Sequence, residues 1–281
     1  MRRTLLAVTV IAALALLATN AFAAGGLKLR YKSSKGETHE YALAMKMESS
    51  TQMMGQEMQQ KMLTEARLKV VTEDVKQNGD IIFISSMDSL KLEIHALPMT
   101  DTSFTNPPGL IGKRSRVTFS NTGRELSREQ VDSIQMTGPF AGAALRTSSF
   151  LVPLDAREVG IGDSLVVEKV DTTAGKEGNM VTTTTVHYFV AGKENKEGHE
   201  CVKLPYTMTV KLTGTGSQMG QQFAIDGEGR GTGTVYFDVD KGLLVSSQRT
   251  MDMETTYAMT GDQKMVIPSS QTVESTITLA K

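Results

Sequence analysis

Cysteine and tryptophan are almost missing from this sequence. Its 281 residues include one cysteine, Cys201, and no tryptophan. A single cysteine excludes an intramolecular disulfide, so the fold must be held together by its own core. Cys201 lies in the run from Glu200 to Leu204, whose alternation is typical of a strand. We therefore expect a buried and inert thiol.

The common catalytic signatures are missing as well. Ser217 lacks the flanking glycines of a nucleophile elbow, and there is no HExxH, phosphate loop or G-x-G-x-x-G. The histidines are scattered along the chain: His39, His95, His187 and His199. His199 and Cys201 would share one face of a strand, and with His187 they could bind a metal. We predict no cofactor and no catalytic residues, although an enzyme without a recognisable motif stays an alternative, since catalytic groups assemble in space.

Long apolar runs are missing after the first 23 residues. Arg2 and Arg3 precede an apolar run from Leu5 to Leu17, and Ala21-Phe22-Ala23 has the form of a cleavage site. The run is too short to cross a bilayer of about 30 Å. We therefore predict a signal peptide over residues 1–23, cleavage near Ala23, and export to the periplasm or the cell exterior. We expect no transmembrane segment after the leader.

A basic surface is also missing. The leader holds two of the 30 basic residues, so 28 remain against 31 acidic ones, a net charge of −3. This balance excludes a nucleic acid or an acidic membrane recognised through a basic field. The remaining residues, 24–281, suffice for one β-rich domain.

Alternation of apolar and polar residues dominates what is present. Met45 and Met47, for example, alternate with Lys46 and Glu48, as in strands half-buried against a core. Turn signals such as 78–80 (Asn-Gly-Asp) separate these runs. The sequence predicts one curved antiparallel sheet of about ten strands, several of them longer than the usual five to six residues. The strands fall into two groups, about 27–120 and 163–280.

One stretch departs from this alternation. Ser127 and Gln130 have the spacing of a capping box, and Gly138-Pro139 would end a helix that starts there. We expect a helical connector over about 127–147, packed against the sheet. The segment 54–70 also fits a helix, with methionines at i, i+4 spacing, but we prefer the strand interpretation.

Methionine is abundant, with 17 residues, several of which form an early cluster over 45–62 and a late cluster over 251–265. It is flexible and polarisable, so it fills irregular cores or lines adaptable apolar surfaces. The first interpretation is a plastic core, and the second is a lipophilic pocket. For the pocket we predict an apolar lining of Met45, Met47, Met62, Met251 and Met253. A third interpretation is thioether ligation of copper(I), for which the candidates are Met53, Met54 and Met58.

Four glycines alternate over 227–233, in the run Gly-Glu-Gly-Arg-Gly-Thr-Gly. On a strand they would lie on one face, in line with Val235 and Phe237. A bare inward face permits close approach by a helix or ligand, or strong bending of the sheet. A glycine-rich loop is the alternative.

Two segments carry a resemblance. The run 185–194 followed by 198–204 resembles a strand–turn–strand of exported proteins related to the LolA-like lipoprotein-carrier superfamily, and 160–165 is similar to another segment of such proteins. The overall order also resembles a family of exported bacterial proteins of unknown function. The resemblance implies a curved half-barrel with helices on its concave side and a hydrophobic-ligand role. We therefore predict a non-enzymatic envelope binding or structural protein whose partner is a lipid or apolar small molecule.

Overall fold

Strands make up the whole of the regular structure. The computed structural model describes residues 26–53, 55–97, 101–133, 150–175, 178–218, 221–260 and 265–280. The leader predicted over 1–23 lies outside these residues. The strands are β1 (Leu27–Lys28), β2 (Thr38–Met53), β3 (Gln56–Val75), β4 (Ile81–Leu97), β5 (Thr102–Thr105), β6 (Arg114–Phe119), β7 (Glu125–Gln130), β8 (Glu158–Val159), β9 (Ser164–Gly175), β10 (Gly178–Phe189), β11 (Gly192–Lys196), β12 (His199–Gln218), β13 (Gln221–Asp238), β14 (Leu243–Thr260) and β15 (Met265–Leu279).

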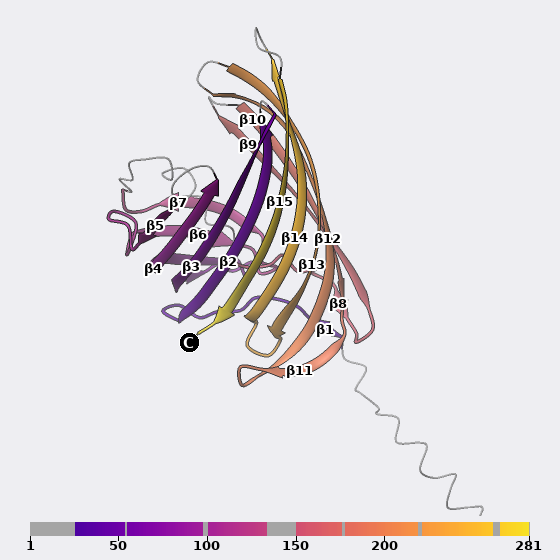
Figure 1. The fold of residues 1–281 in the computed structure, drawn as a ribbon. Coiled ribbons are helices and arrows are strands. Elements are labelled where there is room, and N and C mark those ends of the chain that lie inside the picture. Colours follow the sequence, from indigo (N-terminus) through magenta and orange to yellow (C-terminus); the bar gives the residue numbers. More distant parts are fainter. Residues whose placement is uncertain are drawn as a thin grey trace, which may run out of the picture.

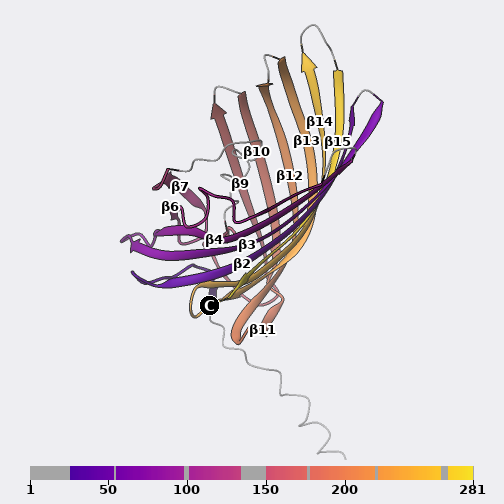
Figure 2. The ribbon, with the colours of Figure 1, turned by 60° about the vertical axis from the view of Figure 1, so that its left-hand side comes forward.

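Thirteen of these strands form one antiparallel sheet. Its order is β7-β6-β4-β3-β2-β15-β14-β13-β12-β10-β9, with β5 added beside β4 and β11 beside β12. Because the path ends at β7 on one side and β9 on the other, the sheet is open. Pairing of β15 with β2 joins the two predicted strand groups into this single sheet. Figures 1 and 2 show its strong twist and curl.

The alternation and turn signals of the sequence predicted these strands correctly. Residues 56–75 form strand β3, not a helix, and its length of 20 residues confirms that several strands are long. The turn between β3 and β4 places Gly79 at φ 85°, and the turn between β13 and β14 places Gly242 at φ 65°. These are left-handed conformations that glycine adopts without steric cost.

The core fills one end of the sheet. There the segments around β1 and β8, which pair with each other, lie against the face that we call the inner face. Phe150 stacks edge-on against Phe83 and Phe119, with ring centroids 5.8 and 5.2 Å apart. The Tyr31 hydroxyl donates to the Val152 carbonyl, and the Tyr188 hydroxyl donates to that of Pro153. The sheet is thus closed over at this end by loop segments.

Hydrogen bonds also bring the two edges of the sheet together at the core end. The Arg124 guanidinium, in the turn before β7, donates to the Glu168 carbonyl of β9 at 3.2 Å. The Leu154 amide donates to the Thr122 carbonyl of the same turn. The curl seen in the figures therefore ends in direct contact between the β6–β7 turn and β9.

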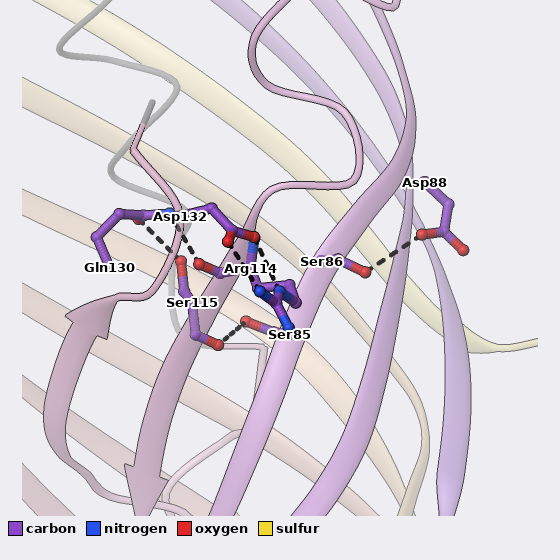
Figure 3. A network of polar contacts seen from close by, with 7 residues as sticks. All are labelled: Ser85, Ser86, Asp88, Arg114, Ser115, Gln130 and Asp132. Atoms are coloured by element: carbon purple, nitrogen blue, oxygen red, sulfur yellow. Dashed lines mark hydrogen bonds and ion pairs between the residues drawn. The ribbon is translucent and has the colours of Figure 1, made fainter. Parts of the chain in front are cut away.

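The helical connector predicted over 127–147 is wrong where the structure describes it. Residues 125–130 form β7, whose Ser127 and Gln130 pair with Thr118 and Ser115 of β6. Figure 3 shows the contacts that fasten this edge: the Arg114 guanidinium donates to both carboxylate oxygens of Asp132, and the Gln130 amide donates to the Arg114 carbonyl. The free edge of β6 thus outweighs the local capping signal. The rest of the predicted connector, 134–147, lies outside the described residues.

The described residues form no helix. They therefore contain no helix that is long and apolar enough to cross a membrane. The predicted β-rich, curved antiparallel sheet is confirmed, whereas the expected packing of helices on its concave side is not found in the described part of the chain.

Candidate functional site

A continuous apolar row crosses the inner face just beyond the core. Residues paired directly across antiparallel strands project to the same face, so the register defines the row. It passes through nine strands: Ile94, Met62, Met47, Val273, Met251, Gly231, Met208, Val186 and Val167. We call these nine residues the methionine row, because four of its members are methionines.

The methionine row is only partly covered. Ile94, Val273, Met208 and Val186 are buried, with 5–7% of their surface exposed. Met47, Met62 and Met251 are half-buried. The described residues therefore leave the methionines of β3, β2 and β14 partly exposed on either side of the buried Val273.

The structure brings the predicted apolar lining onto one face. Met47, Met62 and Met251 belong to the methionine row itself. Met45 lies one row nearer the core, opposite Thr64, and Met253 lies one row farther away, opposite Gln271 and Gly229. All five side chains are half-buried. Their role in ligand binding stays a prediction.

Of the copper(I) candidates, the structure describes the side chain of Met58. It lies on the inner face near the start of β3, opposite Thr51. Met53 is the last residue of β2, and its backbone pairs with Gln56. Met54 lies outside the described residues. Copper(I) ligation by these three residues stays a prediction.

The glycine run lies in β13, so the strand interpretation is correct and the loop alternative is wrong. All four glycines face inward, and side chains of neighbouring strands lie over each of them, most closely over Gly231 and Gly233. A Cβ atom on Gly231 would lie 3.1 Å from Met208 Cγ. A Cβ atom on Gly233 would lie 2.4 Å from Tyr206 Cζ. The bare stripe thus makes room for large side chains of β12.

Sequence reasoning missed one inward-facing cation, Arg249 of β14. It lies opposite Gly233 on one side and Ser275 on the other, one row nearer the core than Met251. Its Nε atom is buried and has no hydrogen-bond partner in the described part of the protein. The alternation of β14 could have revealed this arginine, because Arg249, Met251 and Met253 are each two residues apart and therefore project to the same face of the strand.

Tyr206 stands beside this arginine across Gly233. Its ring packs against that of Tyr188, with centroids 5.3 Å apart. Burial raises the pKa of the Tyr206 hydroxyl, and this rise is only partly opposed by the charge of Arg249 and by a hydrogen bond with Ser247. The hydroxyl therefore stays protonated near neutral pH and can donate or accept a hydrogen bond.

Beyond the methionine row the inner face becomes polar on three neighbouring strands. The next row contains Ser49, Gln60 and Gln271, which are paired across β2, β3 and β15, and it continues with Met253 on β14. On the edge strand β9, Lys169 and Asp171 also face inward and form an ion pair at 2.8 Å. Over β2, β3 and β15 the apolar surface is therefore a band with a polar border on one side and the core on the other.

A second candidate lies at the closed end, where two histidines line a hollow of about 610 Å³. His39 Nε2 lies 3.1 Å from Glu37, and His199 Nδ1 lies 2.8 Å from Asp238. Both carboxylates also accept backbone amides of their own turns, from Ser34 and Lys241. These carboxylates are therefore engaged in holding turns together, which accounts for both pairs without a ligand.

The metal site considered from the sequence does not form in the described residues, where no three metal-binding side chains gather. His199 is held by Asp238, and His187 is exposed. Cys201 is fully buried, as predicted. Burial, followed by the nearby charge of Asp238, raises the pKa of its thiol to about 11, so we expect an unreactive cysteine.

Comparison with known proteins gives little information about the function of this chain. No family model and no curated protein matches the chain. The matching solved structures include Pseudomonas aeruginosa OccK2 (OpdF), alone and in complex with glucuronate. They share 6% and 7% identity, cover 87% and 88% of this chain and 98% and 100% of their own, and have TM-scores of 0.25 and 0.28. Likeness at this level carries no argument about function.

These findings correct the expected relationship to the LolA-like superfamily. The structures that match are those of another protein, and neither the family models nor the curated proteins support the relationship. The strand–turn–strand that suggested it is present as β10, β11 and β12, but such hairpins occur in many antiparallel sheets. Local hairpin chemistry was therefore mistaken for a family signature.

Proposed function

We propose that this protein is an exported, non-enzymatic envelope protein that binds the apolar chain of a lipid along the methionine row. The observation that carries the proposal is the continuity of that row across nine strands, with half-buried methionines on β3, β2 and β14. Export rests on the leader expected over residues 1–23.

The dimensions of the open part suit a hydrocarbon chain. Met62, Met47, Val273 and Met251 lie on four neighbouring strands, so they span three interstrand spacings, or about 14 Å. Burying each methylene group of a chain against them contributes about 0.8 kcal/mol. Methionine side chains adjust their shape to what they contact, so they suit a flexible chain better than branched residues would.

The experiment measures binding of the fluorescent fatty acid cis-parinaric acid to the purified full chain. We expect Met47→Gln/Met62→Gln to weaken binding about tenfold or more, because two apolar contacts are replaced by polar groups that need water. The matched control is Glu48→Gln/Lys61→Gln, which changes the adjacent pair on the outer face of the same two strands.

Organic extraction of the protein from its native host, followed by mass spectrometry, gives an independent test. Absence of any co-purifying lipid, together with no parinaric acid binding, would refute the proposal. Equal weakening by the inner and outer pairs of substitutions would contradict the assignment of the chain to the inner face.

A further inference from the structure

Arg249 places a positive charge on an otherwise uncharged part of the inner face. Its direct cross-strand neighbours are Gly233 and Ser275. Its neighbours of the same parity along β14 are Ser247 and Met251. The acidic residues of this strand, Asp252 and Glu254, have the opposite parity and are exposed on the outer face.

This charge has no counter-ion among the described residues. An arginine cannot lose its proton in a protein, so the guanidinium stays charged whatever surrounds it. Arg249 is half-buried, and an unmet buried donor such as its Nε is costly. Arg249 forms no described ion pair, and its Nε is a buried donor without a partner. Residues 134–149, the longest undescribed stretch after the leader, contain no Asp or Glu that could supply the charge.

The surroundings of Arg249 are polar enough to receive an anion. Tyr206 lies on the far side of Gly233 and has its hydroxyl near the position that a Cβ atom on Gly233 would take, at 2.5 Å. Ser247 is hydrogen-bonded to Tyr206, and Ser275 lies directly opposite Arg249. The cation is therefore bordered by three hydroxyl groups and by no carboxylate among the described residues.

We propose that Arg249 binds the anionic head group of the ligand, a carboxylate or a phosphate, while the acyl chain lies on the methionine row. Rows two residues apart on a strand are separated by about 6.6 Å, so a head group on Arg249 brings the first methylenes to Met251 and to Val273 on the neighbouring strand. The planar guanidinium matches carboxylate and phosphate oxygens in a bidentate manner. This inference rests on the proposed function and narrows the ligand to an anionic amphiphile.

The test compares three ligands with the same chain and different head groups: oleate, 1-oleoyl lysophosphatidic acid and uncharged oleyl alcohol. Each is titrated by calorimetry into the wild type, Arg249→Gln, Arg249→Lys and the control Arg230→Gln. Arg230 lies on the neighbouring strand β13, three residues from the Gly233 that faces Arg249, and is exposed on the outer face. Thermal unfolding of each variant establishes that it is folded.

We expect the wild type to bind at least one anion about 10- to 100-fold more tightly than the alcohol, the range for a charged hydrogen bond. Arg249→Gln should abolish this preference while leaving alcohol binding within about threefold, and Arg230→Gln should change neither. Arg249→Lys should keep part of the preference for the anions, because the lysine ammonium keeps the positive charge but lacks the bidentate geometry of the guanidinium. A preference for oleate alone assigns a carboxylate, and one for the lysolipid alone assigns a phosphate.

Two results would overturn the inference in different ways. If all three ligands bind equally to the wild type, or if Arg249→Gln weakens the alcohol as much as the anions, Arg249 does not read the head group, although apolar binding stands. If none of the three binds, the proposed function itself is refuted. Should Arg249→Gln fail to fold, the wild-type comparison and Arg249→Lys still decide the question.

Discussion

Gly233 provides a sharp test of how the inner face is built. A Cβ atom at this position would lie 2.3 Å from the Gln248 carbonyl oxygen and 2.4 Å from Tyr206 Cζ. Ordinary contacts of a Cβ begin near 3.4 Å. The substitution Gly233→Ala therefore requires both the backbone of β14 and the Tyr206 ring to move by about 1 Å.

The matched comparison is Gly229→Ala, four residues earlier on the same face of the same strand. There the nearest atom to the new Cβ is the Asp252 carbonyl oxygen at 3.2 Å, and the next is Val210 Cβ at 3.5 Å. Overpacking typically costs about 1–3 kcal/mol, and the backbone contact places Gly233→Ala at the upper end. Gly229→Ala gains about 0.4–1 kcal/mol from the unfolded chain, which offsets its mild crowding. We expect the two free energies of unfolding to differ by about 2 kcal/mol.

Equilibrium unfolding in urea, followed by circular dichroism, measures this difference. A second arm repeats Gly233→Ala in a Tyr206→Ala background, where the cost should fall by about 1 kcal/mol, because only the contact with Gln248 remains. Two results would contradict this reasoning: that Gly233→Ala lowers the free energy of unfolding no more than Gly229→Ala, or that it does so by the same amount with and without Tyr206. Either result would show that Gly233 is not needed to accommodate the Tyr206 ring, and our explanation of the glycine stripe would be wrong.

Two further predictions concern titratable groups at the closed end. Burial opposes ionisation of Asp238, but hydrogen bonds from the Lys241 amide and His199 outweigh it, so the pKa of Asp238 is lowered from its ordinary value of about 3.9. Its stabilisation is present above that value and is lost as pH falls through the lower folded pKa, so Asp238→Asn should flatten the acid dependence of Tm measured between about pH 5 and 2. Cys201, whose pKa is raised to about 11, should react with Ellman's reagent at pH 8 only after urea unfolds the protein, and rapid labelling of the native state would contradict its burial.

The sequence predicts the strands well because each strand is half-buried. Alternation in β2 and β13 follows directly from one face meeting apolar neighbours and the other meeting water. The failure at Ser127 has a different cause. A capping box describes three or four residues, whereas β7 is held by its partner β6 and by the distant ion pair of Arg114 with Asp132. Neither contact can be recognised from the few residues around Ser127.

The sequence predicts which face of its strand each residue of the candidate site occupies, but not which residues of other strands lie next to it. Parity alone places Met45 and Met47 together, and Met251 and Met253 together. That Met47 and Met251 flank Val273 depends on pairing of β15 with β2, which closes more than 200 residues of chain. The same register places Arg249 among uncharged neighbours. The sequence around Arg249 does not indicate which strands lie beside it.

The inner face changes in character along its strands, and this change argues for an occupant. Near the core, aromatic and branched side chains such as Phe119 and Val235 are fully buried. A sheet that needed only a core would turn polar at once beyond them. Instead Arg249 and the methionine row intervene before Ser49 and its polar neighbours begin. Methionines can fold over one another when the surface is empty and part when a chain arrives. Arg249 at their border has no counter-ion among the described residues, and an anionic amphiphile would supply one while covering the apolar row.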